Sequence, residues 1–177
     1  MASVLYQDTY LPNSFLDQTI QICVVTRDIK RALKEYAERM GIGPWWCHDF
    51  EAPLLKDSKV RGKPTKFSMH LALAWTGTMM WELVQPKEGP TIYKEFLEKH
   101  GEGIHHVAFS HQGLSFEECI EAFEARGCPC IMEGNWSGIR FRYFDTEGPT
   151  HTTFEIFDWP AGRNLPEPQY WYPAKKK

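Results

Sequence analysis

The chain has 177 residues, of which 42% are hydrophobic and 24% charged, a composition typical of one globular unit or of two small modules sharing a core. The formal net charge is −3, from 20 basic and 23 acidic residues, which argues against a nucleic-acid partner. No apolar run approaches the roughly 18 residues of a membrane span, and residues 1–15 lack the basic start and apolar core of a signal peptide. Five cysteines at irregular positions do not suggest a disulfide framework, so a cytoplasmic protein with reduced thiols is expected.

The first half reads as a strand, a helix and a hairpin. Residues 19–25 (TIQICVV) predict a strand, and apolar residues at helical spacing predict a helix over about 28–40, ended by the glycines that follow it. Residues 45–66 carry no regular pattern and are expected to form a loop. Two apolar runs, 69–75 and 79–86, flank a Thr-Gly-Thr turn and predict a hairpin.

The second half repeats this order after a short connecting helix over about 91–99. Residues 105–110 (HHVAFS) predict a strand, and Ser115 with Glu118 fits a capping box at the start of an amphipathic helix. A closing hairpin is expected from 139–144 and 152–160.

Two similar halves therefore divide the chain. The expected boundaries are 15–87 for the first module, 88–103 for the linker helix, 104–160 for the second module and 161–177 for a C-terminal tail. The tail is rich in proline and aromatic residues, which predicts an extended strap rather than a further helix or strand.

Strand parity places four polar side chains on one face, opposite large apolar neighbours. Gln21 and His106 lie in the opening strands of the two halves, and Glu82 and Glu155 lie in the closing strands. We call these four residues the polar quartet. Three oxygen donors and one imidazole suit a divalent ion with room for a substrate, whereas a closed structural zinc site would use Cys and His. The alternative is that each residue simply faces water, but recurrence in both halves favours convergence.

These residues carry a family resemblance. Residues 21–28 (QICVVTRD), 81–86 (WELVQP), 101–109 (GEGIHHVAF) and 154–157 (FEIF) resemble the vicinal oxygen chelate superfamily, which includes glyoxalase I, methylmalonyl-CoA epimerase, bleomycin-resistance proteins and extradiol dioxygenases. The resemblance implies an α+β fold in which two tandem βαβββ modules form a curled mixed sheet around a central cavity. It also implies that the polar quartet holds one metal ion. The run over 101–109 looks most like methylmalonyl-CoA epimerase.

Gln21 departs from that subfamily, whose members usually carry His at the first ligand position. The Gln/Glu/His/Glu set instead looks like animal-type glyoxalase I, an enzyme that builds its site across two chains. Both relatives remove a proton next to a carbonyl, and a metal acting as a Lewis acid can stabilise the resulting enolate. The sequence therefore predicts a metal-dependent isomerase, epimerase or lyase, with Glu155 and Glu82 as ligands of which at least one also moves the proton. Zn, Ni, Co, Mn and Fe remain open as the metal.

Two other functions remain open. An Fe(II) extradiol-type dioxygenase would prefer two His and one carboxylate, so Gln21 counts against it unless His70 joins the site. A non-enzymatic, resistance-type binding protein would have no use for four ligands. The expected partner is a small molecule rather than nucleic acid or membrane, and exposed strand edges are compatible with a homodimer.

Several further residues are weaker candidates for a role in the site. His70 is expected in the pocket or on the surface, and His105 is expected to point away from His106 and to be structural. His48 and Glu51 are expected on an exposed loop. The remaining candidates are a basic cluster that could meet an anionic tail (Lys59, Arg61, Lys63, Lys66) and three tryptophans that could line the substrate site or fill the core (Trp45, Trp46, Trp75).

Overall fold

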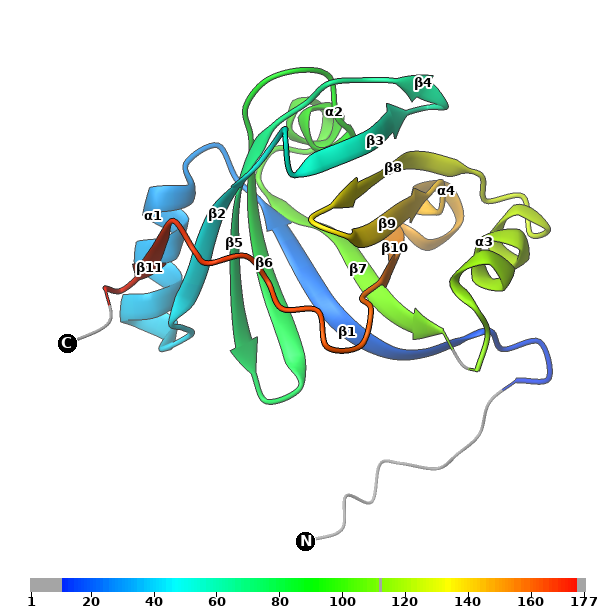
Figure 1. Cartoon of the computed structure of the whole chain (residues 1–177), viewed down its shortest axis with the longest axis horizontal. Coiled ribbons are helices and arrows are strands. Elements are labelled where there is room, and N and C mark those ends of the chain that lie inside the picture. Colours follow the sequence, from blue (N-terminus) through cyan, green and yellow to red (C-terminus); the bar gives the residue numbers. More distant parts are fainter. Residues whose placement is uncertain (1–10, 112, 175–177) are drawn as a thin grey trace, which may run out of the picture.

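A computed structural model describes residues 11–111 and 113–174, and one continuous curled sheet dominates it (Figure 1). The strands are β1 (Leu16–Val25), β2 (Trp45–Phe50), β3 (Leu55–Val60), β4 (Lys63–Pro64), β5 (Met69–Thr76), β6 (Met79–Pro86), β7 (Gly103–His111), β8 (Cys130–Trp136), β9 (Ile139–Phe144), β10 (Thr153–Asp158) and β11 (Tyr170–Tyr172). The helices are α1 (Ile29–Lys34), α2 (Ile92–Lys99), α3 (Phe116–Glu124) and α4 (Glu147–Thr150). The prediction that residues 1–15 do not form a signal peptide falls largely on residues 1–10, which lie outside the described residues.

The sheet is built from two copies of the same unit. Its strand order is β11-β2-β5-β6-β1-β7-β10-β9-β8-β3-β4. In each half the first strand pairs in parallel with the last, β1 with β6 and β7 with β10, and the intermediate strands follow outward in antiparallel order. The halves join where β1 and β7 pair antiparallel. The predicted class, a curled mixed sheet of two βαβββ modules, is confirmed.

Strands β2, β3 and β4 correct the expectation of a loop over residues 45–66. β2 pairs with β5, whereas β3 crosses to the edge of the other half and pairs with β8. The lysines on β3 and β4 obscured the pattern, because charged residues are frequent on edge strands that face water.

The C-terminal tail runs from β10 across the open side of the sheet, as the predicted strap, and ends as a strand (Figure 1). Its residues 170–172 form β11 on the outer edge of β2, which sequence reasoning did not expect. The Trp46 Nε1 atom donates to the Pro166 carbonyl at 3.0 Å, which ties the tail to β2.

The helices that the sequence predicted are present, and they begin at capped N-termini. Ser115 and Glu118 form the reciprocal capping box at the start of α3. Thr91 caps α2 through the Lys94 amide. The helix predicted over 28–40 is α1, continued by a wider π-helical turn over Glu35–Arg39.

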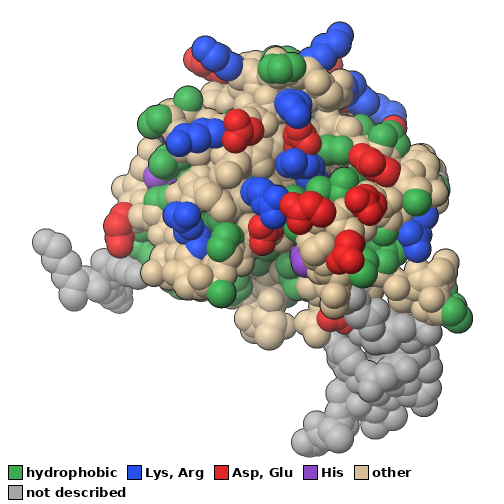
Figure 2. All heavy atoms as spheres, turned by 45° about the vertical axis from the view of Figure 1, so that its right-hand side comes forward, with side chains coloured by type: hydrophobic (Ala, Val, Ile, Leu, Met, Phe, Trp, Pro, Cys, Tyr) green, Lys and Arg blue, Asp and Glu red, His purple; other side chains and the backbone are tan. Residues whose placement is uncertain are grey.

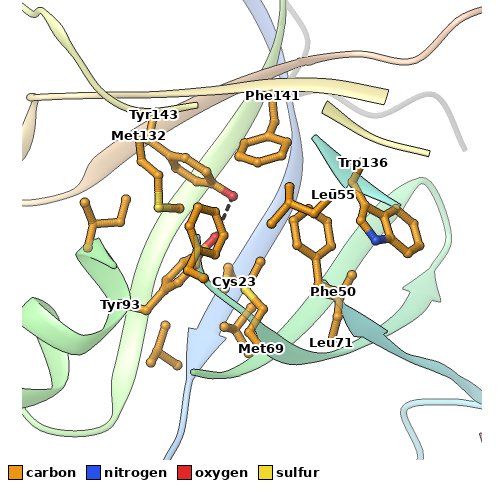
Figure 3. Packing of buried hydrophobic residues seen from close by; sticks show 14 of the residues in the cluster. Cys23, Phe50, Leu55, Met69, Leu71, Tyr93, Met132, Trp136, Phe141 and Tyr143 are labelled. Atoms are coloured by element: carbon orange, nitrogen blue, oxygen red, sulfur yellow. Dashed lines mark hydrogen bonds between the residues drawn. The ribbon is translucent and has the colours of Figure 1, made fainter. Parts of the chain in front are cut away.

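Three apolar clusters hold the described part of the chain together. The largest lies inside the curl of the sheet and includes Phe50, Trp136 and Phe141 (Figure 3). A second lies under α1, and a third lies under α3. Trp81 and Phe154, the neighbours of two quartet residues, pack into these outer clusters, so the glutamates beside them are turned to the inside.

The outer surface shown in Figure 2 mixes basic and acidic side chains rather than gathering one sign. Several of the charges are paired, for example Arg140 with Asp158 and Arg142 with Glu133. Across the described residues, no helix has both the length and the apolar character that crossing a membrane requires.

Candidate metal centre

The register of the four central strands places the polar quartet in two adjacent rows on the inner face. Cys23 lies level with Glu82 on β6 and with His106 on β7. In the next row, Ala108 lies level with Gln21 on β1 and with Glu155 on β10. Residues level with one another on neighbouring strands point to the same face, so all these side chains share the concave side. The small Ala108 side chain leaves room between its two larger neighbours.

The His106 ring is the meeting point of the quartet. Its Nε2 atom lies 3.1 Å from Glu155 Oε2, 3.2 Å from Glu82 Oε2 and 3.4 Å from Gln21 Nε2. All four residues are buried, with exposures between 0% and 8%. The structure therefore brings the predicted residues together, and because all four come from one chain, the cluster is complete without a second copy.

The cluster contains two carboxylates and one imidazole, and their interaction shifts the pKa values of its members. Burial disfavours the charged form of His106, but Glu155 and Glu82 outweigh it and raise the pKa of the ring to about 9. Burial raises the pKa of Glu155, which His106 only partly offsets. One N–H cannot satisfy both carboxylates. Glu82 Oε2 and Glu155 Oε2 both lie close to His106 Nε2, but both are buried and neither has a donor in hydrogen-bonding geometry.

A second layer of polar groups orients the cluster. His106 Nδ1 lies 2.9 Å from His105 Nδ1, and burial together with His106 holds the pKa of His105 well below its usual range. A neutral His105 can accept a hydrogen bond from the Nδ1–H group of His106, which leaves His106 Nε2 available as a ligand. On the other side, the Tyr93 hydroxyl donates to the Tyr143 hydroxyl at 2.7 Å (Figure 3). The Tyr143 hydroxyl in turn lowers the pKa of Glu155, against the larger effect of burial.

The residues present fit a divalent metal ion. Two buried carboxylate oxygens lack a donor, a buried imidazole nitrogen lies between them, and a doubly charged cation would neutralise the two carboxylates. Sequence reasoning missed one further ligand type. The Cys23 thiol, Glu82 and His106 bring potential ligand atoms within 4.8 Å of one another. Cys23 lies two residues after Gln21 on the same strand, so strand parity puts both side chains on one face, and this was the available signal.

The weaker histidine and acidic candidates lie away from the centre. His70 is 40% exposed and pairs with Asp49 on the outer surface, because alternation along β5 turns it away from the cavity. His48 is a half-buried residue of β2 whose ring stacks on Trp46, and Glu51 pairs with Lys87. His105 is buried as expected of a structural residue, although it touches His106.

The basic cluster and the three tryptophans also lie away from the candidate metal centre. Lys59 pairs with Glu133 and Arg61 pairs with Glu95, whereas Lys63 and Lys66 are exposed residues outside the cavity lining. Trp45 packs in the cluster under α1, Trp46 packs inside the sheet, and Trp75 is 44% exposed.

A curled sheet of two βαβββ units, with a cluster of potential metal ligands where they join, defines the glyoxalase-like class of fold. The chain belongs to the Glyoxalase/Bleomycin resistance protein/Dioxygenase superfamily, whose family profile matches residues 20–143. No curated protein sequence matches the chain significantly.

Solved structures share this fold at low sequence identity. Methylmalonyl-CoA epimerase from Mycobacterium tuberculosis is 14% identical, with a TM-score of 0.60 over 85% of this chain and 94% of that chain. A hypothetical protein from Bacillus halodurans C-125 is 19% identical, with a TM-score of 0.58 over 84% of this chain and 98% of that chain. A variant of 4-hydroxymandelate synthase from Streptomyces coelicolor is 12% identical, with a TM-score of 0.58 over 85% of this chain and 51% of that chain.

Proposed function

We propose that the chain is a metal-dependent isomerase, epimerase or lyase that moves a proton at a carbon next to a carbonyl group. The observation that carries the proposal is the convergence of two donor-free carboxylate oxygens on one buried imidazole, at the side of an apolar cavity. The polar quartet would hold the ion, with Gln21 turning its amide oxygen inward. A divalent metal bound there would supply Lewis-acid polarisation of the substrate carbonyl.

In this proposal, Glu82 and Glu155 carry out the proton transfer. Glu82 and Glu155 both line the cavity from opposite sides of His106, so either can reach a substrate carbon. We assign Glu155 as the proton acceptor, because it is 4% exposed and burial excludes competing water. Glu82, the second carboxylate of the lining, would return the proton.

The donor set favours this chemistry over an iron oxygenase. An extradiol-type site uses two imidazoles and one carboxylate, whereas this cluster offers one imidazole and two carboxylates, with His70 turned to the outer surface. The paired carboxylates are what a proton-transfer reaction needs.

Metal content tests the proposal directly. Protein purified without a histidine tag, offered Zn, Ni, Co, Mn and Fe, should retain about one ion per chain, as a four-ligand site requires. The Glu155→Ala variant should lose it, while the exposed-surface variant Glu124→Ala should keep it. Metal-loaded protein should also catalyse deuterium exchange at carbons next to carbonyls, followed by NMR. Failure of every metal to bind would overturn the metal-dependent mechanism, and stoichiometric ligand binding without exchange would favour the binding-protein alternative.

A further inference from the structure

The cavity beside the metal centre has a nearly uniform lining. Its walls are Gln21, Phe50, Met69, Leu71, Leu73, Met80, Glu82, Trp136, Ile139, Phe141, Tyr143, Glu155, Phe157, Trp159 and Leu165. Three quartet members supply its ionisable and amide groups, and almost everything else is aliphatic or aromatic. The lining thus combines a polar end with mostly apolar walls.

No described Lys, Arg or His side chain belongs to this lining. Alternation along β9 turns Phe141 and Tyr143 inward, whereas Arg140 and Arg142 point outward, where they pair with Asp158 and Glu133. The one imidazole at the polar end, His106, already contacts both glutamates. Along the apolar walls, a free carboxylate or phosphate on a ligand would therefore meet no cation. At the polar end of the metal-free protein it would meet two negative side chains, at a cost that burial enlarges.

Aromatic rings form part of the cavity walls, and Figure 3 shows Phe50, Trp136 and Phe141 gathered on the inner side of the sheet. Phe50 stacks on Trp136 with ring centroids 5.0 Å apart and planes 16° apart, and Phe141 meets Phe50 edge-on at 5.5 Å. Such walls favour a flat ring through stacked and edge-to-face contacts. The lining also offers a donor, because Trp136 Nε1 is buried and has no hydrogen-bond acceptor. A ligand oxygen within hydrogen-bonding distance would accept a hydrogen bond from this indole N–H.

We infer that the substrate of this site is an uncharged aromatic carbonyl compound, such as an aryl ketone or ester, without a free carboxylate or phosphate near the ring. The carbonyl part of this inference rests on the proposed function, whereas the charge and shape preference rests on the lining alone. Among relatives that share the fold, this would distinguish the chain from any that act on acidic substrates.

A matched pair of probes tests the preference by isothermal titration calorimetry. Methyl 3-benzoylpropanoate and the 3-benzoylpropanoate anion share a skeleton and differ in charge. We expect the ester to bind at least about tenfold more tightly than the anion to metal-free protein. The Leu165→Arg variant places a guanidinium in the lining from a half-buried position and should reduce or reverse the preference. Leu11→Arg, at a position 70% exposed and outside the lining, should not.

Equal or tighter binding of the anion by the metal-free wild-type protein, or binding of neither probe, would overturn the inference. These outcomes are distinguishable from failure of the proposed function, because metal content is measured separately. A protein that binds metal but prefers the anion would keep its mechanism and lose this substrate class. A protein that prefers the ester but binds no metal would keep the substrate class and lose the mechanism.

Discussion

Replacing Glu155 with glutamine keeps the shape of the side chain and removes one of the two buried negative charges. One imidazolium at His106 can balance one carboxylate, so the other is in excess in the metal-free protein, and the Oε2 atoms of Glu82 and Glu155 lack a donor. A buried polar group without a partner costs about 1–3 kcal/mol. Because His106 keeps its contact with Glu82, we expect metal-free Glu155→Gln to be more stable than wild type by about 1–3 kcal/mol.

Metal should reverse this order. At a free concentration one hundred times its Kd, an ion that binds only the folded state stabilises it by about 2.7 kcal/mol. For a chain of this size each kcal/mol raises Tm by about 2–4 °C, so wild type should gain about 5–11 °C on addition of Zn²⁺ or Co²⁺. Glu155→Gln should lose most of that gain because it lacks one ligand.

Thermal melts and urea titrations, each with EDTA and with metal, measure both effects. Glu124→Gln, at an exposed position of α3, serves as the control and should follow wild type in both conditions. A metal-free Glu155→Gln variant less stable than wild type would show that the excess-charge reasoning is wrong. An undiminished metal shift in the variant would remove Glu155 from the ligand set.

Two further predictions concern Cys23 and Glu102. Cys23→Ser should weaken binding of the thiophilic ions Zn²⁺ and Cd²⁺ by about tenfold or more, because sulfur is a soft ligand. Binding of Mn²⁺ should be nearly unchanged. Equal losses of affinity for all three ions in competition titrations would exclude the thiol as a ligand. Glu102 accepts from the Arg27 amide and the Thr26 hydroxyl and pairs with Arg31, contacts that lower its pKa to about 2. This stabilisation is present above the ordinary carboxyl pKa and is lost as the pH falls from about 5 to about 2, so urea titrations of Glu102→Gln should show a smaller loss over that range than wild type.

Strand parity was the strongest source of information in the sequence. It depends only on the two-residue repeat of a strand, so it placed the polar quartet on one face without knowledge of the pairing. What the sequence could not provide was the register. The level pairing of Cys23 with both Glu82 and His106 arises from β1 lying between β6 and β7, a long-range arrangement that adds the thiol to the cluster.

The regions that differed from expectation are short or sit at the edge of the sheet. β3 runs along the edge of the opposite half, and its Leu55 and Val60 are buried while the lysines between them face outward. β11 has three residues, too few for a periodic pattern to be recognised. Both strands owe their existence to a partner that lies far away in the chain, which local preference cannot reveal.

The antiparallel pairing of β1 with β7 is the reason that the candidate site requires both halves of the chain. Each half contributes one residue from its opening strand and one from its closing strand, Gln21 with Glu82 and His106 with Glu155. Within one half, a single carboxylate with one or two further donors does not make up the four-ligand set that we propose. When the opening strands pair antiparallel, His106 Nε2 comes within 3.4 Å of donors from both halves. The candidate metal centre is therefore complete only where the two halves are joined, and metal binding should favour the joined state over separated halves.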